Sequence, residues 1–440
     1  MKGFPRRTLL ELTRRSPDSV PRDAVVVATA AIEAVWSRGE RALREYAERF
    51  GDVLPGAPLV IERDALARAL ARLPASDRER LERVAARIRS FAEAQRQALA
   101  VVTVPVPGGA AGHWVAPVER AGCYAPGGRY PLPSSVLMTA VTARVAGVRE
   151  VWVASPNPPP ITLAAAAVAG ADGLLCAGGA HAIAALAYGA GPIPPCDAIV
   201  GPGNRFVTAA KQLVAGGGVA IDTLAGASEL LVFADAGADP GVVAAELVAQ
   251  AEHDPDARPM LVTTDATFAD RVDEELDRQL ADLPTAGIAR AALANGGVIV
   301  VQNVDEGIAT CDAIAPEHLR LDLRDAAAVA TRLAHYGALF IGSGSSVVLG
   351  DYGVGPNHVL PTAGTARQAA GLSVYAFLRV RTWLRIDDPV AARPLLDDAA
   401  WFARVEGLEA HARAAERLGD HSRGAGREGA TVTRASAGSG

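Results

Sequence analysis

The chain has 440 residues, which is too long for one ordinary hydrophobic core and favours two or three domains. Half of the residues are hydrophobic, so a largely disordered protein is excluded, and the formal net charge of −6 gives no electrostatic reason to expect nucleic acid as a partner. Four dispersed cysteines without a Cys-X-X-Cys motif exclude a disulfide scaffold, and no apolar stretch is typical of a signal peptide or a membrane span. We therefore expect a cytoplasmic protein that contacts neither nucleic acid nor a membrane.

The predicted elements form two alternating sets after a helical start. Apolar residues at helical spacing predict helices through the first hundred residues. Strands are then expected at 121–124, 150–154 and 197–200, with helices over 134–145 and from residue 205 onward. The second set has strand candidates at 230–234, 260–263, 297–301 and 338–341. This alternation predicts an α/β fold in which parallel sheets carry helices on both faces.

The C-terminal part of the chain has a different pattern. From Asp351 to about Val374 it is rich in loop-forming residues, and a helical tail is expected from there to about Leu418. Residues 419–440 show no periodicity and consist largely of small and polar residues, so we expect them to be disordered.

Two glycine-rich segments follow predicted strands. Residues 201–204 (Gly-Pro-Gly-Asn) stand between a strand and a helix, where free backbone amides attract phosphate, and residues 126–128 (Pro-Gly-Gly) are placed similarly. Each segment taken alone is equally well explained as a tight turn. The full G-x-G-x-x-G fingerprint is absent, so any dinucleotide site would differ from the common one.

Polar residues at two further places could carry chemistry. Gln250 and His253 share a face at the end of a helix that Asp239 and Pro240 open, although a plain polar helix end is the simpler interpretation because Gln is an uncommon zinc ligand. The adjacent Glu317 and His318 could supply two proton-transfer groups from a loop, or could be a helix-start Glu beside a surface His.

Asp351 opens a segment so dense in Gly and Pro that a shaped loop is expected. Glu406 and His411 would point about 140° apart on one continuous helix. They can serve one site only if Gly407 breaks the helix or the ligand is large; otherwise they belong to a surface helix.

Taken together, these segments resemble the histidinol dehydrogenase family from about residue 20 to about residue 418. The stretches that carry the resemblance are GCYAPGG (122–128), PSSVLM (133–138), GPGNRFVTAAK (201–211), SELLVFAD (228–235), QAEHDP (250–255), APEHL (315–319), GDYGVGPNHVLPT (350–362), GLSVYAFL (371–378) and EGLEAH (406–411). Several occur in the family's order and spacing. The resemblance implies an NAD-dependent enzyme that holds one zinc ion per subunit and oxidises L-histidinol to L-histidine through bound L-histidinal.

The resemblance also implies roles for individual residues. The implied zinc ligands are Gln250, His253, Asp351 and His411. The implied catalytic pair is Glu317, which activates water, and His318, which takes the alcohol proton. The implied substrate contacts are Ser228, His318 and Glu406 together with the four zinc ligands, and the implied NAD contacts are Tyr124, His181 and Asn204. The family forms homodimers with intertwined tails, so Glu406 and His411 are expected to reach the site of the other subunit.

The implied organisation has two Rossmann-like domains that lack the usual glycine fingerprint. Residues 1–118 are expected to be a helical segment that starts domain 1, and residues 119–227 the NAD-contacting domain 2. Residues 228–375 are expected to complete domain 1 with the zinc and catalytic residues, and residues 376–418 to form the helical swapped tail.

This chain departs from the family pattern in places. His181 replaces the usual Gln, and an imidazole can still bond a ribose hydroxyl, but a change in NAD affinity is expected. Residues 226–229 read Gly-Ala-Ser-Glu in place of Gly-Pro-Ser-Glu, which loosens the loop that holds Ser228. Residues 343–347 also differ, in a way that concerns loop packing.

Other functions fit parts of the same pattern. A relative could oxidise another small alcohol, such as a sulfonated diol, on the same scaffold. A zinc hydrolase with Glu317 as base would need an open metal position and no NAD. A non-catalytic nucleotide-binding protein is expected to have lost part of the zinc or Glu-His set, and none is missing. Cys123, the one thiol near a cofactor-like loop, has no neighbouring base in sequence and is expected to be a core residue.

Overall fold

The computed structural model describes residues 3–13, 20–127, 130–224 and 226–419. Within this range the chain forms two units, one built from Met1–Arg96 and Pro117–Phe377 and the other from Gln97–Ala116 and Leu378–Gly440. Residues 420–440, which contain nearly all of the segment expected to be disordered, lie outside the described residues, as does Gly128 of the first glycine-rich segment. No described helix is both long and apolar enough to cross a membrane.

The first sheet of unit 1 has six strands in the order β1-β6-β5-β4-β7-β8. All neighbours run parallel except β1, which is antiparallel to β6. The strands are β1 (Val60–Glu62), β4 (Arg120–Tyr124), β5 (Glu150–Ala154), β6 (Gly173–Leu175), β7 (Ala198–Val200) and β8 (Ala220–Ile221). The connecting helices are α6 (Pro133–Ala146), α7 (Pro160–Val168), α8 (Gly179–Tyr188) and α9 (Arg205–Gly216).

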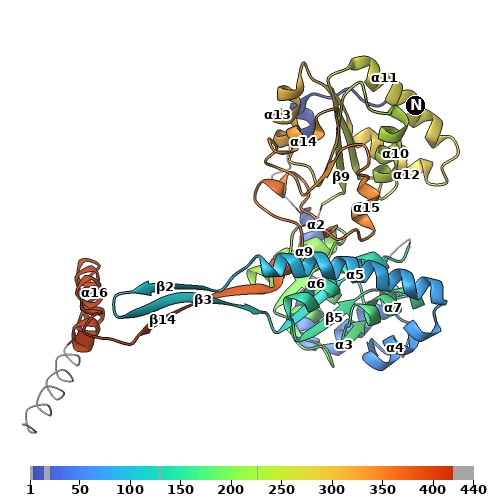
Figure 1. Ribbon diagram of the computed structural model, residues 1–440. Helices are drawn as coiled ribbons and strands as arrows, with labels where there is room; N and C mark the ends of the chain where they lie inside the picture. Colours follow the sequence, from blue (N-terminus) through green and yellow to red (C-terminus); the bar gives the residue numbers. More distant parts are fainter. Residues whose placement is uncertain (1–2, 14–19, 128–129, 225, 420–440) are drawn as a thin grey trace, which may run out of the picture. The chain divides into compact units, whose positions relative to one another are not determined.

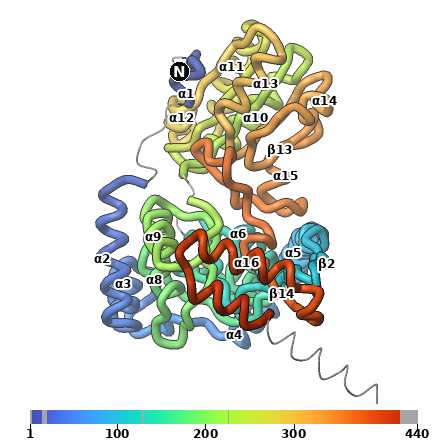
Figure 2. Tube along the Cα trace, turned by 90° about the vertical axis from the view of Figure 1, so that its left-hand side faces the viewer, coloured from blue at the N-terminus to red at the C-terminus, as the bar shows by residue number. Residues whose placement is uncertain are grey.

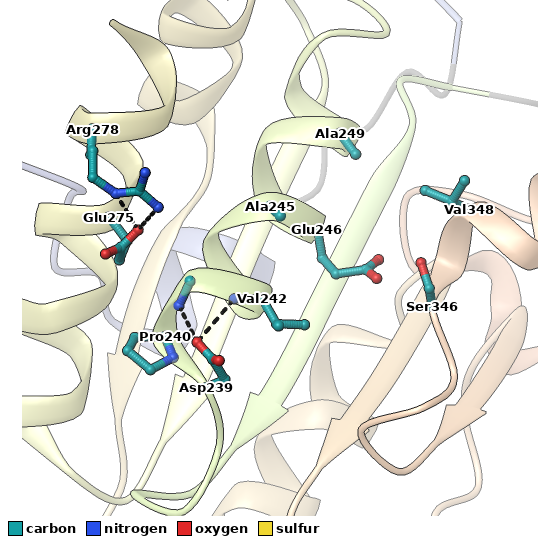
Figure 3. A pocket seen from close by; sticks show the side chains of 11 residues that line it. Asp239, Pro240, Val242, Ala245, Glu246, Ala249, Glu275, Arg278, Ser346 and Val348 are labelled. Atoms are coloured by element: carbon teal, nitrogen blue, oxygen red, sulfur yellow. Dashed lines mark hydrogen bonds and ion pairs between the residues drawn. The ribbon is translucent and has the colours of Figure 1, made fainter.

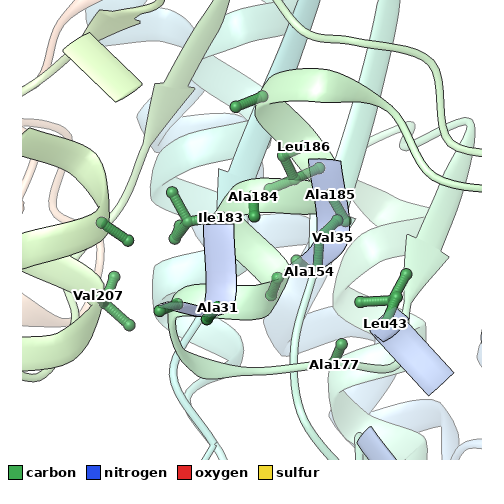
Figure 4. Packing of buried hydrophobic residues seen from close by; sticks show 14 of the residues in the cluster. Ala31, Val35, Leu43, Ala154, Ala177, Ile183, Ala184, Ala185, Leu186 and Val207 are labelled. Carbon is green, nitrogen blue, oxygen red and sulfur yellow. The ribbon is translucent and has the colours of Figure 1, made fainter. Parts of the chain in front are cut away.

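The N-terminal segment divides between the two sheets, which corrects its expected place at the start of domain 1. Helices α2 (Arg22–Arg38) and α3 (Glu40–Phe50) pack beside α8 and α9 (Figure 2), and α4 (Arg63–Arg72) packs on α7. Small side chains let these helices approach closely, as the alanines around Ile183 show (Figure 4). Only the first described residues pack on the second sheet. Phe4, which precedes α1 (Leu9–Thr13), and Leu12 on α1 lie in its two hydrophobic cores. The long helix α5 (Ala75–Gln97) completes the segment.

The second sheet has five parallel strands in the order β11-β10-β9-β12-β13. They are β9 (Glu229–Ala234), β10 (Arg258–Thr263), β11 (Gly297–Val300), β12 (His318–Asp322) and β13 (Ala338–Ile341). Helices α13 (Val304–Ile314) and α14 (Ala326–Ala330) cover one face, and α10 (Pro240–Ala251), α11 (Ala266–Leu280) and α12 (Ala286–Asn295) lie on the other (Figure 1). The α/β fold class with parallel sheets is confirmed.

Strand β12 is one of the elements that the sequence pattern does not reveal. Strands buried on both faces normally read as continuous apolar runs. Here His318 and Arg320 interrupt the run, yet every residue of β12 is buried. After β13 the chain forms the short helix α15 (Val347–Asp351), two 3₁₀ turns (Thr365–Arg367 and Val374–Phe377) and irregular loops.

Unit 2 is a three-stranded sheet in the order β14-β3-β2 with helices at its C-terminal end. Strands β2 (Val102–Val106) and β3 (Gly109–Pro117) end the segment expected to be helical up to residue 118. The tail expected to be helical over 376–418 instead begins with β14 (Leu378–Ile386), whose arginines at 379, 381 and 385 alternate with apolar residues at the period of a strand. Helix α16 (Arg393–Val405) follows, and Gly407, at a φ of 76°, separates it from helical residues 409–419.

Candidate active site

The predicted catalytic residues lie at the amino edge of the second sheet. Glu317 immediately precedes β12 and His318 is its first residue, while Ser228 immediately precedes β9. The side chains of Glu317 and His318 are 8% and 6% exposed, so the pair is not a surface feature. The expectation of a surface His is therefore wrong, because β12 carries His318 into the interior, whereas Glu317 lies in the loop that enters β12, as expected.

Backbone groups of β9 fix the two catalytic side chains. The Glu229 N–H donates to Glu317 Oε2 at 2.8 Å, and His318 Nδ1 lies 3.0 Å from the carbonyl oxygen of Glu229. Because a carbonyl only accepts, Nδ1 carries a proton and donates it there. His318 Nε2 is the nitrogen that remains for chemistry, and it is buried without a hydrogen-bond partner.

Two carboxylates flank the His318 ring. Glu317 Oε2 lies 3.6 Å from Nδ1, and Asp351 Oδ1 lies 3.6 Å from Nε2. Burial by itself lowers the pKa of His318, but the charges of Glu317 and Asp351 outweigh it and raise the pKa to about 10. A cation that neutralises either carboxylate would therefore lower the pKa of this imidazole.

Asp351, the last residue of α15, links the catalytic pair to His253. Its Oδ2 lies 4.0 Å from His253 Nε2. Burial raises the pKa of the Asp351 carboxyl, but the neighbouring His318 lowers it below its ordinary value. His358 Nδ1 donates to the carbonyl oxygen of Asp351 at 2.7 Å, and burial lowers the pKa of His358. Sequence reasoning assigns no role to His358, although its place in the Gly- and Pro-rich segment was a usable signal.

Helix α10 delivers the other two predicted ligands of unit 1. As expected, Asp239 caps it by accepting from the N–H groups of Gly241 and Val242, and Pro240 is its first residue. Gln250 is buried in its last turn, and His253 follows the helix end with 46% of its side chain exposed. Unit 1 thus supplies an amide, an imidazole and a carboxylate to the proposed metal site.

The donor set fits zinc in chemistry, and the His253–Asp351 pair fits it in spacing. Two ligands about 2.0–2.1 Å from one tetrahedral zinc ion lie roughly 3.4 Å apart, close to the 4.0 Å between His253 and Asp351. Among the residues that the structure describes, no group of three His, Cys, Asp or Glu side chains is arranged to hold a metal ion.

Glu406 and His411 are exposed residues of unit 2. Gly407 breaks the helix between them, which meets one of the two conditions for their sharing a site.

Glu229 is a second residue that sequence reasoning misses. It is buried, its Oε1 accepts from an Arg258 guanidinium nitrogen at 2.9 Å, and its Oε2 accepts from the Ala363 N–H at 3.2 Å. Burial raises its pKa above the ordinary value. Glu229 therefore ties the segment after Ser228 to the loop at residue 363; an acid at the start of an otherwise apolar strand was the signal.

The predicted nucleotide contacts lie at the carboxyl edge of the first sheet. Tyr124 ends β4, and its hydroxyl accepts from the Gly179 N–H at 3.1 Å, while Asn204 follows β7 and caps α9. Gly201 has a φ of 121°, and a Cβ there would stand 2.0 Å from the Tyr124 carbonyl oxygen. Only glycine allows the loops after β4 and β7 to approach this closely, so the two loops form one surface at the point where the strand order reverses.

His181 is buried beside this edge. Its Nε2 lies 3.0 Å from Asp52 Oδ2, and its ring stacks on Tyr46 and Phe50 with centroids 5.3 and 5.7 Å away. Asp52 also accepts from the Gly178 N–H. Next to it lies a pocket of about 440 Å³ whose lining includes Phe50, Asp52, Gly127, Ser155, Asn157 and Thr162.

Comparison with known proteins agrees with the motifs. The sequence model of the histidinol dehydrogenase family matches residues 14–418. The chain is 47% identical to histidinol dehydrogenase of Thermus thermophilus over 384 residues, which cover 87% of this chain and 91% of that protein. It is 42% identical to that of Pseudomonas fluorescens over 424 residues, or 94% and 95% of the two chains. The crystal structure of histidinol dehydrogenase from Elizabethkingia anophelis superimposes with a TM-score of 0.87 at 31% identity, covering 94% of this chain and 96% of that one. The chain therefore belongs to the histidinol dehydrogenase family.

Proposed function

We propose that this chain catalyses the NAD-dependent oxidation of L-histidinol to L-histidine through bound L-histidinal, with one zinc ion per subunit. The observation that carries the proposal is the arrangement of Glu317, His318, Asp351 and His253 at the amino edge of the second sheet of a family member. Members of the family act on a small-molecule substrate, and this edge offers two proton-transfer groups beside ligands for a cation.

His318 is the base for the alcohol. Its Nδ1 is held by the Glu229 carbonyl, so Nε2 takes the hydroxyl proton, and NAD held at Tyr124 and Asn204 would supply the hydride acceptor. Glu317 then removes a proton from the water that adds to the aldehyde, and oxidation of the resulting hydrate would need a second NAD as the hydride acceptor. Retaining the aldehyde in the site avoids release of a reactive intermediate.

Gln250, His253, Asp351 and the partner-facing His411 would hold the zinc ion. When bound, zinc supplies a Lewis acid that orients the nitrogen atoms of the substrate. Asp351 then directs less negative charge at His318, so the imidazole is better suited to act as a base.

The cysteine route to aldehyde oxidation is disfavoured. Cys123 is fully buried, and burial raises the pKa of its thiol to about 12. A thiol with that pKa is not a thiolate nucleophile near neutral pH. All four cysteines are buried and unpaired, which agrees with a cytoplasmic location.

We also propose a homodimer, supported by the apolar surface of unit 2. Leu384, Trp401, Phe402 and Val405 are all more than half exposed there. The buried cluster of unit 2 consists of four alanines with Leu396 packed against them, too small a core to stabilise an independent domain. A second copy of the chain would cover this surface and receive Glu406 and His411 in its site.

A complementation assay tests the shared site. Heterodimers of His411→Ala and Glu317→Gln subunits contain one site with both wild-type residues, so activity should return in them above that of either homodimer. Verified heterodimers without any recovered activity would contradict the exchange of His411.

A substrate comparison tests the function itself. We expect NADH to form from histidinol, with two NADH per histidine, and to stop when a chelator removes the metal. Turnover of a sulfonated diol in preference to histidinol would support the related dehydrogenase instead. Hydrolytic activity without NADH would support the zinc hydrolase.

A further inference from the structure

A fully buried arginine lies beneath the candidate active site. Arg320 in β12 has no exposed surface, and its terminal nitrogens lie 3.0 Å from Glu246 Oε1 and 3.0 Å from Asp322 Oδ2. Its Nη2 also donates to the carbonyl oxygen of Ser343 at 3.1 Å, whereas its Nε makes no hydrogen bond and its Nη1 meets the Glu246 carboxylate at ion-pair distance without hydrogen-bond geometry. A buried ion pair with an unsatisfied donor is a poor device for stability alone, because apolar side chains of similar size often do as well or better.

The Arg320–Glu246 pair joins the elements that carry the site residues. Arg320 is two residues after His318 in β12, so both side chains emerge on the same face of the sheet. Their cross-strand neighbours, Leu230 and Val232, pack with α10 in one core, so this is the face that α10 covers. Glu246 is one turn before Gln250 on that helix.

Glu246 also fixes the start of α15, the helix that ends at Asp351. Its Oε2 accepts from the Val347 N–H at 3.1 Å, whereas Ser346, at the N-cap position, makes no side-chain cap. Figure 3 shows Glu246 reaching from α10 toward the segment of Ser346 and Val348. Val347 is the one buried residue of this five-residue helix, so few other contacts hold α15 in place.

We propose that Arg320 and Glu246 form a positioning pair that sets Asp351 and the end of α10 at the spacing needed for metal binding beside His318. The inference rests on the proposed zinc site. Neither residue touches the reacting atoms; each acts through α10, α15 and β12. Outer residues that orient metal ligands typically change metal affinity by about 10–100-fold when they are lost.

The test separates positioning from stability with a double substitution. Arg320→Met and Glu246→Leu alone each leave a buried charge unpaired, and both should lower the melting temperature and weaken zinc binding. The double variant removes both charges of the pair but leaves Asp322 without its cation, so its melting temperature should recover only part of the loss seen in the single variants. Its zinc affinity, measured on metal-free protein against a chromophoric chelator, should stay about tenfold or more below wild type. A folded double variant with wild-type zinc affinity would overturn the proposal.

Conservative variants cover the case in which the double variant does not fold. Glu246→Gln keeps an oxygen for the Val347 N–H and should stay within about threefold of wild-type zinc affinity, whereas Arg320→Lys keeps the charge but loses the planar fork and should fall by about tenfold. Wild-type affinity in Arg320→Lys would contradict the pair's role. Arg332→Met is the matched control, since it removes an exposed partner of Asp305 in the same sheet domain and should leave zinc affinity unchanged.

The outcome is separable from that of the proposed function. Zinc titration uses neither NAD nor histidinol. A wild-type protein that binds zinc but forms no NADH from histidinol would refute the proposed function and leave the positioning pair standing. A wild-type protein that binds no zinc would remove the positioning pair together with its metal site.

Discussion

The parallel strands of the two sheets of unit 1 share one order, but the two sheets carry their predicted site residues at opposite edges. In each, the first of the parallel strands (β4 or β9) lies centrally, with the next two on one side and the last two on the other, and the first sheet adds the antiparallel β1 at its edge. Tyr124 and Asn204 stand at the carboxyl edge of the first sheet, where ligands usually bind in open α/β sheets. Ser228 and Glu317 stand at the amino edge of the second. Topology therefore predicts the place of the nucleotide residues but not that of the proton-transfer pair.

Each edge is fixed by a buried cation. In the first sheet, Lys211 donates to the Gly201 carbonyl oxygen at 2.9 Å and pairs with Asp222, which accepts from the Gly201 N–H at 2.7 Å. In the second sheet, Arg320 and Glu246 hold α10 and α15. The comparison predicts that substitutions at the carboxyl edge of the first sheet change cofactor binding. Substitutions at the amino edge of the second sheet should change metal binding and proton transfer.

The largest effect is expected from Glu317→Gln at the amino edge. Without a carboxylate to activate water, oxidation of histidinal should fall about 10²–10⁴-fold, whereas alcohol oxidation by His318 should fall much less. Single-turnover rates with histidinol and with histidinal, measured on zinc-loaded protein, give the two values. An equal loss in both steps would remove the role assigned to Glu317.

Lys211→Met should act on the carboxyl edge. It leaves Asp222 buried without its cation and should destabilise the fold by about 3–5 kcal/mol. We expect the KM for NAD to rise because the Gly201 loop loses a donor, while zinc affinity stays at the wild-type value. Calorimetry measures the stability, a steady-state titration with NAD gives the KM, and competition with a chelator gives the zinc affinity. Weakened zinc binding with an unchanged KM for NAD would contradict the division between the two edges.

His181→Ala should have an intermediate effect on stability. Asp52 would keep the Gly178 N–H but lose its imidazole partner, and the rings of Tyr46 and Phe50 would lose the imidazole on which they stack. The free energy of unfolding should fall by about 1–3 kcal/mol. His181→Gln restores a donor for Asp52 and should recover most of the stability. Chemical denaturation measures both; an alanine variant as stable as the wild type would show that the Asp52 contact contributes nothing.

The smallest effect is expected from Cys123→Ala. Burial raises the pKa of the thiol, and the thiol takes no part in the proposed chemistry. Turnover should therefore stay within about twofold of wild type. A steady-state assay with histidinol is sufficient. A loss of several orders of magnitude, with zinc and NAD still bound, would favour a cysteine mechanism.

Much of the fold can be predicted from the sequence because most strands are uninterrupted apolar runs. Residues 150–154 and 338–341 are strands within the expected limits. Strand β12 cannot be predicted in this way, since Arg320 is buried through partners that lie far away in sequence. The strand over 378–386 could have been predicted from its alternating arginines.

The candidate site depended on motifs more than on periodicity. The resemblance singled out Glu317, His318, Asp351 and His253, and the structure brings these four together. Spacing alone could not do so, because three separate elements supply them. Glu229 and His358 act on their neighbours through backbone groups, and sequence does not show which backbone group a side chain meets.

The most direct test of the two-edge division is an anomalous difference map at the zinc absorption edge from crystals grown with NAD and histidinol. We predict one zinc peak within about 2.0–2.2 Å of His253 Nε2 and an Asp351 oxygen, and NAD against Tyr124 and Asn204. Zinc bound away from both ligands, or NAD bound away from the carboxyl edge of the first sheet, would contradict the account.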